Sequence, residues 1–171
     1  MPKKQVPFIG NDKITLKLLT LEDLPLTREW RNHNDIRRWF FHSDIISEAQ
    51  HNRWFQNYLE RDDDYVFVIY EIERLCRPVG QIALYNIDWL ERRAEYGRLM
   101  IGDMKARGQG LARIATDLLL EFSFSTWELS EVYLEVFADN LAAIRLYEAC
   151  GFVVSKETDG IKHMHRVAKI Y

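Results

Sequence analysis

The residues with the clearest chemical potential lie in a glycine-rich turn in the second half of the chain. An apolar run at 99–101 precedes the turn, and apolar side chains then recur at 111, 114, 115, 118, 119 and 122. This spacing predicts a strand, a turn and a long amphipathic helix. A helix start has unpaired N–H groups and about half a positive charge, so it attracts phosphate oxygens. Gly108 and Gly110 lack a Cβ atom, and Arg107 and Arg113 add charge, so we expect the turn to hold a pyrophosphate.

The spacing within the turn separates three kinds of pyrophosphate site. A dinucleotide fingerprint needs a third glycine where Arg113 stands, and a P-loop needs Gly-Lys followed by Ser or Thr, which is absent. What remains is Arg107-x-x-Gly110-x-Ala112. This pattern resembles the acetyl-CoA-binding motif of the GCN5-related N-acetyltransferases (the GNAT family). The alternative is an ordinary loop that leads into an ordinary core helix.

A second motif and the order of the predicted elements support the same resemblance. Residues 140–152 read Asn-x-x-Ala-x-x-Leu-Tyr-Glu-x-x-Gly-Phe, which is similar to that family's second diagnostic motif. The resemblance extends over 14–170. It implies a single N-acetyltransferase domain over 1–171, with acceptor recognition at about 20–60 and an acetyl-CoA-binding core at about 94–152. The implied fold is α/β (α+β), a mixed, mostly antiparallel central sheet of six to seven strands flanked by about four helices.

Periodicity and capping residues place these elements along the chain. Thr20 and Ser47 each begin a capping box, Asn140 precedes a third helix that ends at Gly151, and Asp159-Gly160 suits a hairpin turn. Arg77-Pro78 marks a turn between two strands. Helices are predicted from 20 to 31, around 35–40, from 47, from 111 and from 140, and strands at 14–18, 65–72, 79–87, 94–101, 132–137, 152–156 and 162–170.

Composition limits the class of protein. The chain has 171 residues, 47% of them hydrophobic, which suits one domain with a sizeable core. The net charge is −3 and no run of Lys and Arg exceeds two residues, so neither nucleic acid nor a membrane surface is an expected partner. Cys76 and Cys150 have no metal or redox spacing and are expected to be buried thiols in a reducing compartment. With neither a signal peptide nor a run of eighteen apolar residues, we expect a soluble, cytoplasmic protein.

Acetyl transfer to an amine needs a neutral amine, a polarised carbonyl and a proton for the departing thiolate. Tyr147 resembles the family's tyrosine that faces the CoA sulfur, although helical spacing also allows a core aromatic. Asn140 is expected to bind the pantetheine arm, to cap its helix, or both, and Glu95 is the candidate base or else a salt-bridged carboxylate. The resemblance and the phosphate argument together give this cofactor-binding set: Leu99, Met100, Ile101, Arg107, Gly108, Gln109, Gly110, Leu111, Ala112, Asn140 and Tyr147.

The first third of the chain is expected to select the acceptor, a small-molecule amine. Trp30, Arg31, Asn32 and His51 look like the corresponding stretch of sugar-nucleotide N-acetyltransferases of the pseudaminic acid pathway. The main hypothesis is therefore direct acetyl transfer, in a ternary complex, to a nucleotide-linked amino sugar. Spermidine or other polyamine and ribosomal-protein N-terminal acetyltransferases share the motifs, and a non-catalytic acyl-CoA-binding module is the alternative of another class. No metal is expected, and a homodimer is possible.

Overall fold

The computed structural model describes residues 2–169, so position 170, where the last strand was expected to end, lies outside the described residues. Within these residues, eight strands form one sheet in the order β1-β2-β3-β4-β5-β6-β8-β7, with β5 and β6 parallel and every other pair antiparallel. The strands are β1 (Ile9–Gly10), β2 (Ile14–Leu18), β3 (Tyr65–Glu71), β4 (Arg77–Asp88), β5 (Arg93–Ile101), β6 (Glu131–Phe137), β7 (Val153–Thr158) and β8 (Ile161–Val167).

The mixed, mostly antiparallel sheet was predicted, with six to seven strands rather than eight. The extra strand, β1, pairs only two residues with β2, which is too short for a hydrophobic period to reveal. Arg77-Pro78 was predicted as a turn but begins β4, because the reversal is completed earlier, at 72–76. Cys76 lies in that reversal with φ 50° and is exposed, so the prediction of a buried thiol was wrong there and right for Cys150.

Within residues 2–169 there are five α-helices; the implied fold has about four, and the fifth is the short piece that the sequence predicted around 35–40. In each helix one set of side chains is buried against the sheet, as amphipathic spacing requires. The helices are α1 (Leu24–Asn32), α2 (Asn34–Arg37), α3 (Glu48–Glu60), α4 (Leu111–Ser125) and α5 (Leu141–Ala149). None of the helices within 2–169 is long and apolar enough to cross a membrane.

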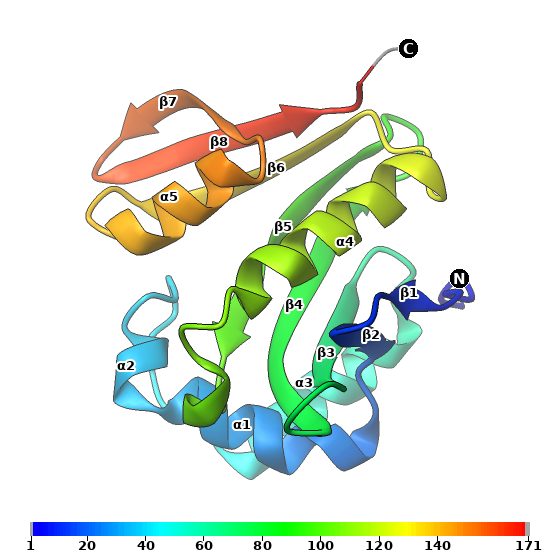
Figure 1. The fold of residues 1–171 in the computed structure, drawn as a ribbon, viewed down its shortest axis with the longest axis vertical. Coiled ribbons are helices and arrows are strands. Elements are labelled where there is room, and N and C mark those ends of the chain that lie inside the picture. The colour runs from blue at the N-terminus through cyan, green and yellow to red at the C-terminus, as the bar shows by residue number, and fades with distance from the viewer. Residues whose placement is uncertain (1, 170–171) are drawn as a thin grey trace.

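The sheet is covered on both faces, so its central strands are apolar on both sides. Phe67 and Ile69 of β3 join the core under α4 and α5, whereas Val66 and Val68 join a second cluster with Phe55 and Tyr58 of α3. Figure 1 shows α4 running across one face of the sheet, with α1 near the opposite end of the strands from the chain termini. This two-sided burial explains why β3 reads as a continuous apolar run.

The predicted caps set the helix boundaries. The Ser47 hydroxyl accepts from the Gln50 amide at 3.2 Å while the Gln50 side chain accepts from the Ser47 amide at 2.9 Å, which starts α3. Thr20 makes its capping box with Asp23 but starts a 3₁₀ turn, Leu21–Asp23, ahead of α1.

The parallel pairing of β5 with β6 is short, and this matters most for the site. Only Arg93, Ala94 and Glu95 pair with β6, after which the two strands diverge (Figure 1). Beyond that point β5 bonds only to β4, and a bulge with Arg98 at φ 53° bends it. A gap therefore opens between β5 and β6 in the middle of the sheet, between the face covered by α4 and the face covered by α3.

Candidate active site

The gap between β5 and β6 contains a cavity of about 310 Å³, here called the transfer cavity. Both faces of the sheet contribute to it, since Tyr85 and Gly97 lie on the α3 side and Tyr96 lies on the α4 side. Six of the predicted cofactor residues line it, namely Leu99, Met100, Ile101, Arg107, Asn140 and Tyr147.

The other five predicted cofactor residues, 108–112, do not line this cavity but form the turn and the start of α4 beside it. Arg107 donates from Nε to the Ile101 carbonyl at 3.1 Å, which fastens the turn to the end of β5. Gly108 and Gly110 have φ 74° and 73°, a left-handed conformation that favours glycine, and Gly110 is the N-cap of α4. A Cβ atom at either glycine would meet no protein atom within 4 Å, so the helix start faces open space that suits a diphosphate.

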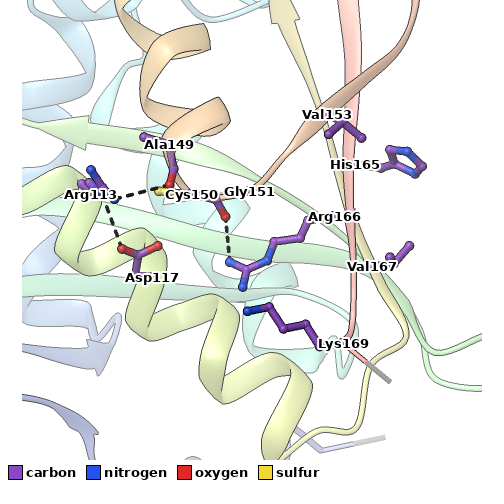
Figure 2. A pocket seen from close by; sticks show the side chains of 10 residues that line it. All are labelled: Arg113, Asp117, Ala149, Cys150, Gly151, Val153, His165, Arg166, Val167 and Lys169. Atoms are coloured by element: carbon purple, nitrogen blue, oxygen red, sulfur yellow. Dashed lines mark hydrogen bonds and ion pairs between the residues drawn. The ribbon is translucent and has the colours of Figure 1, made fainter. Parts of the chain in front are cut away.

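The Arg113 side chain interacts with α4 and α5 and not with the open side of the glycine turn. It pairs with Asp117 at 3.7 Å and donates to the Ala149 carbonyl at 3.5 Å, while Arg166 donates to the Cys150 carbonyl at 2.7 Å. Figure 2 shows these side chains around a separate cavity of about 440 Å³ at the end of α5. Because both arginines bind the last carbonyls of α5, they anchor the helix that carries Tyr147.

Tyr147 lies between the core and the transfer cavity. Its ring packs edge-on against Tyr96, with centroids 5.6 Å apart, and against Phe152 at 6.0 Å. Burial, and then the neighbouring Cys150 thiol, raise the pKa of Tyr147 above its ordinary value of 10, so the phenol keeps its proton at neutral pH. Asn140 caps α5 by accepting from the Ala143 amide at 3.3 Å and also lines the cavity, so both of its predicted roles are compatible.

A second cavity of about 560 Å³, here called the acceptor cavity, opens on the α3 side of the sheet. It is lined by residues of α1, α3 and the loop between α2 and α3, together with β4 and β5. The two cavities have five lining residues in common: Phe40, Phe41, Tyr85, Arg98 and Met100. These five residues are here called the common wall. A thioester in the transfer cavity and an amine in the acceptor cavity would meet there.

Of the four predicted acceptor residues, Arg31 and His51 line the acceptor cavity, whereas Trp30 and Asn32 do not. Trp30 is buried with Ile36 and Met100, and Gly102 lies so close that a Cβ there would be 2.0 Å from the indole. The Asn32 amide donates to the Ile46 carbonyl and accepts from the Ile46 amide, both at 2.8 Å. Trp30 therefore packs in the protein interior and Asn32 holds the loop between α2 and α3, and the residue types alone did not distinguish these functions from ligand binding.

The acceptor cavity contains buried polar atoms that have no partner. In the described part of the chain only three buried side-chain nitrogen or oxygen atoms lack a hydrogen bond, and two of them, Arg31 Nη1 and His51 Nδ1, belong to residues that line this cavity. Burial lowers the pKa of His51 to about 4, and the positive charge of Arg28 contributes, so its imidazole is neutral at pH 7. Arg31 donates to the His42 carbonyl and its guanidinium lies 4.2 Å from the Phe40 ring centroid. Native proteins satisfy such atoms, and a bound acceptor could supply the missing partners.

Glu95, the predicted base, lines neither cavity. Its two carboxylate oxygens accept from the Tyr85 hydroxyl at 3.2 Å and from the Asn86 amide at 2.9 Å. Tyr85, one of the five residues of the common wall, therefore connects Glu95 to both cavities. Sequence reasoning missed Tyr85 and Arg98, because alternation predicts that they share a sheet but not that a bulge turns them toward one gap.

The described residues contain no group of three His, Cys, Asp or Glu side chains that could hold a metal ion. His163 lies 3.3 Å from Glu135 and His165 lies 3.2 Å from Glu131, each on the neighbouring strand. These are cross-strand pairs on β6 and β8.

Known proteins share both the sequence pattern and the fold. Residues 13–153 match the model of the acetyltransferase (GNAT) domain. The chain is 27% identical over 143 residues to a spermidine N(1)-acetyltransferase of Vibrio cholerae (84% of this chain, 80% of the relative) and 26% identical over 139 residues to acetyltransferase PseH of Campylobacter jejuni (81% and 82%). A crystal structure of the Vibrio cholerae spermidine N-acetyltransferase with CoA and spermine superimposes with a TM-score of 0.82 at 25% identity, covering 92% of this chain and 96% of that one. The domain match covers most of the chain and is consistent with the glycine turn and the gap between β5 and β6. The chain therefore belongs to the GNAT family as an N-acetyltransferase that uses acetyl-CoA.

Proposed function

We propose that this enzyme acetylates the primary amine of a nucleotide-linked amino sugar, by direct transfer from acetyl-CoA in a ternary complex. The observation that carries the proposal is the unpartnered Arg31 Nη1 in the acceptor cavity. This donor needs a hydrogen-bond acceptor, and a phosphate oxygen is its preferred partner. A protonated polyamine offers N–H donors and no acceptor, so it would leave Arg31 unsatisfied.

The charges around the acceptor cavity support the same choice. Arg98 is neutralised by Asp64 at 2.7 Å, and His51 is neutral, which leaves Arg31 and a single carboxylate, Asp44, in the lining of the cavity. A polyamine, with several positive charges, would find one carboxylate and one arginine. An acceptor with a diphosphate would find a guanidinium already stripped of part of its hydration.

The size and the aromatic lining of the cavity suit a nucleotide. A cavity of about 560 Å³ lies within the range for small-molecule sites. Phe40, Phe41 and Trp54 offer ring faces on which a base or a sugar can stack.

The catalytic assignments follow from the common wall. Neither cysteine lines the transfer or the acceptor cavity, so the amine itself attacks the thioester rather than an acetylated thiol. In this proposal Tyr147 protonates the thiolate, the strand 99–101 binds the pantetheine arm, and the turn 107–112 binds the diphosphate. Residues of about 20–60 select the acceptor, and those of about 94–152 bind acetyl-CoA.

The test is a panel of acceptors incubated with acetyl-CoA and read out as released thiol. Nucleotide-linked amino sugars should give the highest kcat/KM, and spermidine or N-terminal peptides should be at least tenfold poorer. The relatives named as spermidine acetyltransferases make the polyamine the second candidate, and a higher kcat/KM for spermidine would overturn the proposal.

A charge variant sharpens the test. Arg31→Met should raise KM for the sugar nucleotide at least tenfold, because one charged hydrogen bond is worth about 1.5–3 kcal/mol, and KM for acetyl-CoA should stay unchanged. Arg53→Ala, which removes an exposed arginine of α3 that lines neither cavity, is the matched control. If both variants raise the acceptor KM equally, the effect comes from the general charge of the protein and not from a contact with Arg31.

A further inference from the structure

Tyr85 occupies a place in the site that the motifs do not assign. It lies on β4 directly opposite Glu95 of β5, and its ring extends over the next residue of that face, Gly97. A Cβ atom at Gly97 would lie 2.6 Å from the Tyr85 hydroxyl oxygen. The absence of a side chain at Gly97 thus lets the phenol reach across β5 to the edge of the gap.

Two direct contacts, each supported by a second residue, fix the phenol there. Its hydroxyl donates to Glu95 Oε1 at 3.2 Å, and Asn86 holds the other oxygen of the same carboxylate at 2.9 Å. The Arg98 guanidinium lies 4.1 Å from the Tyr85 ring centroid, and Asp64, almost fully buried, holds that guanidinium at 2.7 Å. The Tyr85 oxygen therefore keeps a lone pair free to accept from a group in the common wall while its proton points at Glu95.

We propose that Tyr85 relays the proton of the attacking amine to Glu95, which has no surface on either cavity. This inference rests on the proposed function, because it concerns the same transfer step. Through Tyr85, Glu95 can accept the amine proton although Glu95 lines neither cavity. Tyr85 is then a catalytic residue and Asn86 a positioning residue.

The step balances as follows. The amine nitrogen attacks the thioester carbonyl, the C–N bond forms and the C–S bond breaks. The surplus N–H proton passes to the Tyr85 oxygen as the Tyr85 proton passes to the Glu95 carboxylate. The thiolate takes a proton from Tyr147, and exchange with solvent then restores Glu95 and Tyr147. The net products are the amide and CoA.

The charged and titratable groups around the phenol favour a relay over a stable phenolate. Glu95 and Arg98 face it from β5, Asp64 faces it from the position just before β3, and Tyr133 of β6 lies near Glu95. Loss of hydration, and then the Glu95 charge, raise the pKa of Tyr85 above its ordinary value. The phenol accordingly stays protonated before and after each turnover.

The test compares kcat for Tyr85→Phe and Glu95→Gln at saturating substrates. Each variant should lose at least about tenfold in kcat with little change in KM for acetyl-CoA, and the double variant should lose no more than the poorer single one, since both act on one proton path. Gly97→Ala, which displaces the hydroxyl but keeps it, should lose kcat in the same direction. The acceptor is the panel amine with the highest turnover, so a failure of the sugar-nucleotide proposal does not affect this comparison.

Acceptor basicity separates a relay from a packing defect. Hydroxylamine is weakly basic, so after attack its proton passes readily to water, and Tyr85→Phe should cost less than about threefold with this probe. Tyr70→Phe is the matched control, because Tyr70 also hydrogen-bonds a carboxylate, Asp23, at 3.3 Å, but lines neither cavity. Equal losses with hydroxylamine and with a strongly basic amine, or multiplicative losses in the double variant, would overturn the relay.

Discussion

Tyr147→Phe is the most direct test of the transfer chemistry. The change removes one hydroxyl and keeps the ring that packs edge-on against Tyr96 and Phe152 at 5.6 and 6.0 Å. Packing and α5 should therefore survive, and the backbone contacts proposed for CoA should survive with them. What is lost is the hydroxyl that we propose protonates the departing thiolate.

The magnitude follows from the burial of this site. The pKa of a thiol is lower than that of a phenol, so proton transfer from Tyr147 to the thiolate would be unfavourable in water. Burial penalises both anions alike, and without the hydroxyl the thiolate would leave as an unpaired buried charge. A hydrogen bond to a charged group contributes about 1.5–3 kcal/mol, and full general acid catalysis about 10²–10⁴-fold. We expect kcat to fall by at least about tenfold and by as much as several thousandfold.

The assay is thiol release at saturating acetyl-CoA and acceptor, with CoA affinity measured separately by calorimetry. The wild-type rate should also show no fall at the ordinary phenol pKa of 10, because burial raises the pKa of Tyr147. If the variant keeps more than about a third of wild-type kcat while chemistry limits the rate, another group protonates the thiolate. Tyr147 would then be a packing residue, and the reasoning given for it would be refuted.

Three further predictions concern the cofactor turn and pH. Acetyl-CoA at a hundred times its Kd should contribute about 2.7 kcal/mol and raise Tm by roughly 5–10 °C in differential scanning calorimetry, and an unmoved Tm would contradict the cofactor site. Gly110→Val should weaken CoA binding at least about tenfold and cost about 1–3 kcal/mol of stability, because φ 73° strains a β-branched residue, and an unchanged Kd with normal circular dichroism would reject the phosphate role. The pKa of His51 is about 4 in the folded protein and 6.5 as its ordinary value, so the unfolded chain binds this proton first as pH falls. Stability should thus be lost between pH 6.5 and 4, and urea unfolding of His51→Gln should show a smaller loss; an identical pH dependence would contradict the burial of this imidazole.

Sequence patterns predicted the elements well where interactions between residues close in the chain determine them. The capping residues Ser47 and Asn140 act over three residues of chain, and Asp159 and Gly160, at φ 54° and 75°, form the predicted turn of the last hairpin. The glycine turn was predictable for the same reason, since positive φ at Gly110 is a property of the backbone itself.

The acceptor side was less predictable because its geometry is non-local. Asn32 and Arg31 are neighbours in sequence, but one clamps the Ile46 backbone and the other faces the cavity. The loop before α3 makes this distinction, because its residue Ile46, fourteen residues further along the chain, bonds to Asn32. Tyr85 likewise owes its position to Gly97 and to the bulge at Arg98, and a sequence period cannot show a bulge.

The short pairing of β5 with β6 has a consequence for the unliganded enzyme. Where the strands diverge, two central strands acquire the unpaired backbone groups of edge strands, which in other proteins promote aggregation. Here those groups lie inside the sheet and not on its outer edge, and we propose that the amide-bearing pantetheine arm binds them. The cofactor would then complete the sheet as well as supply the acetyl group, and the enzyme should resist aggregation best when the cell keeps it charged with CoA.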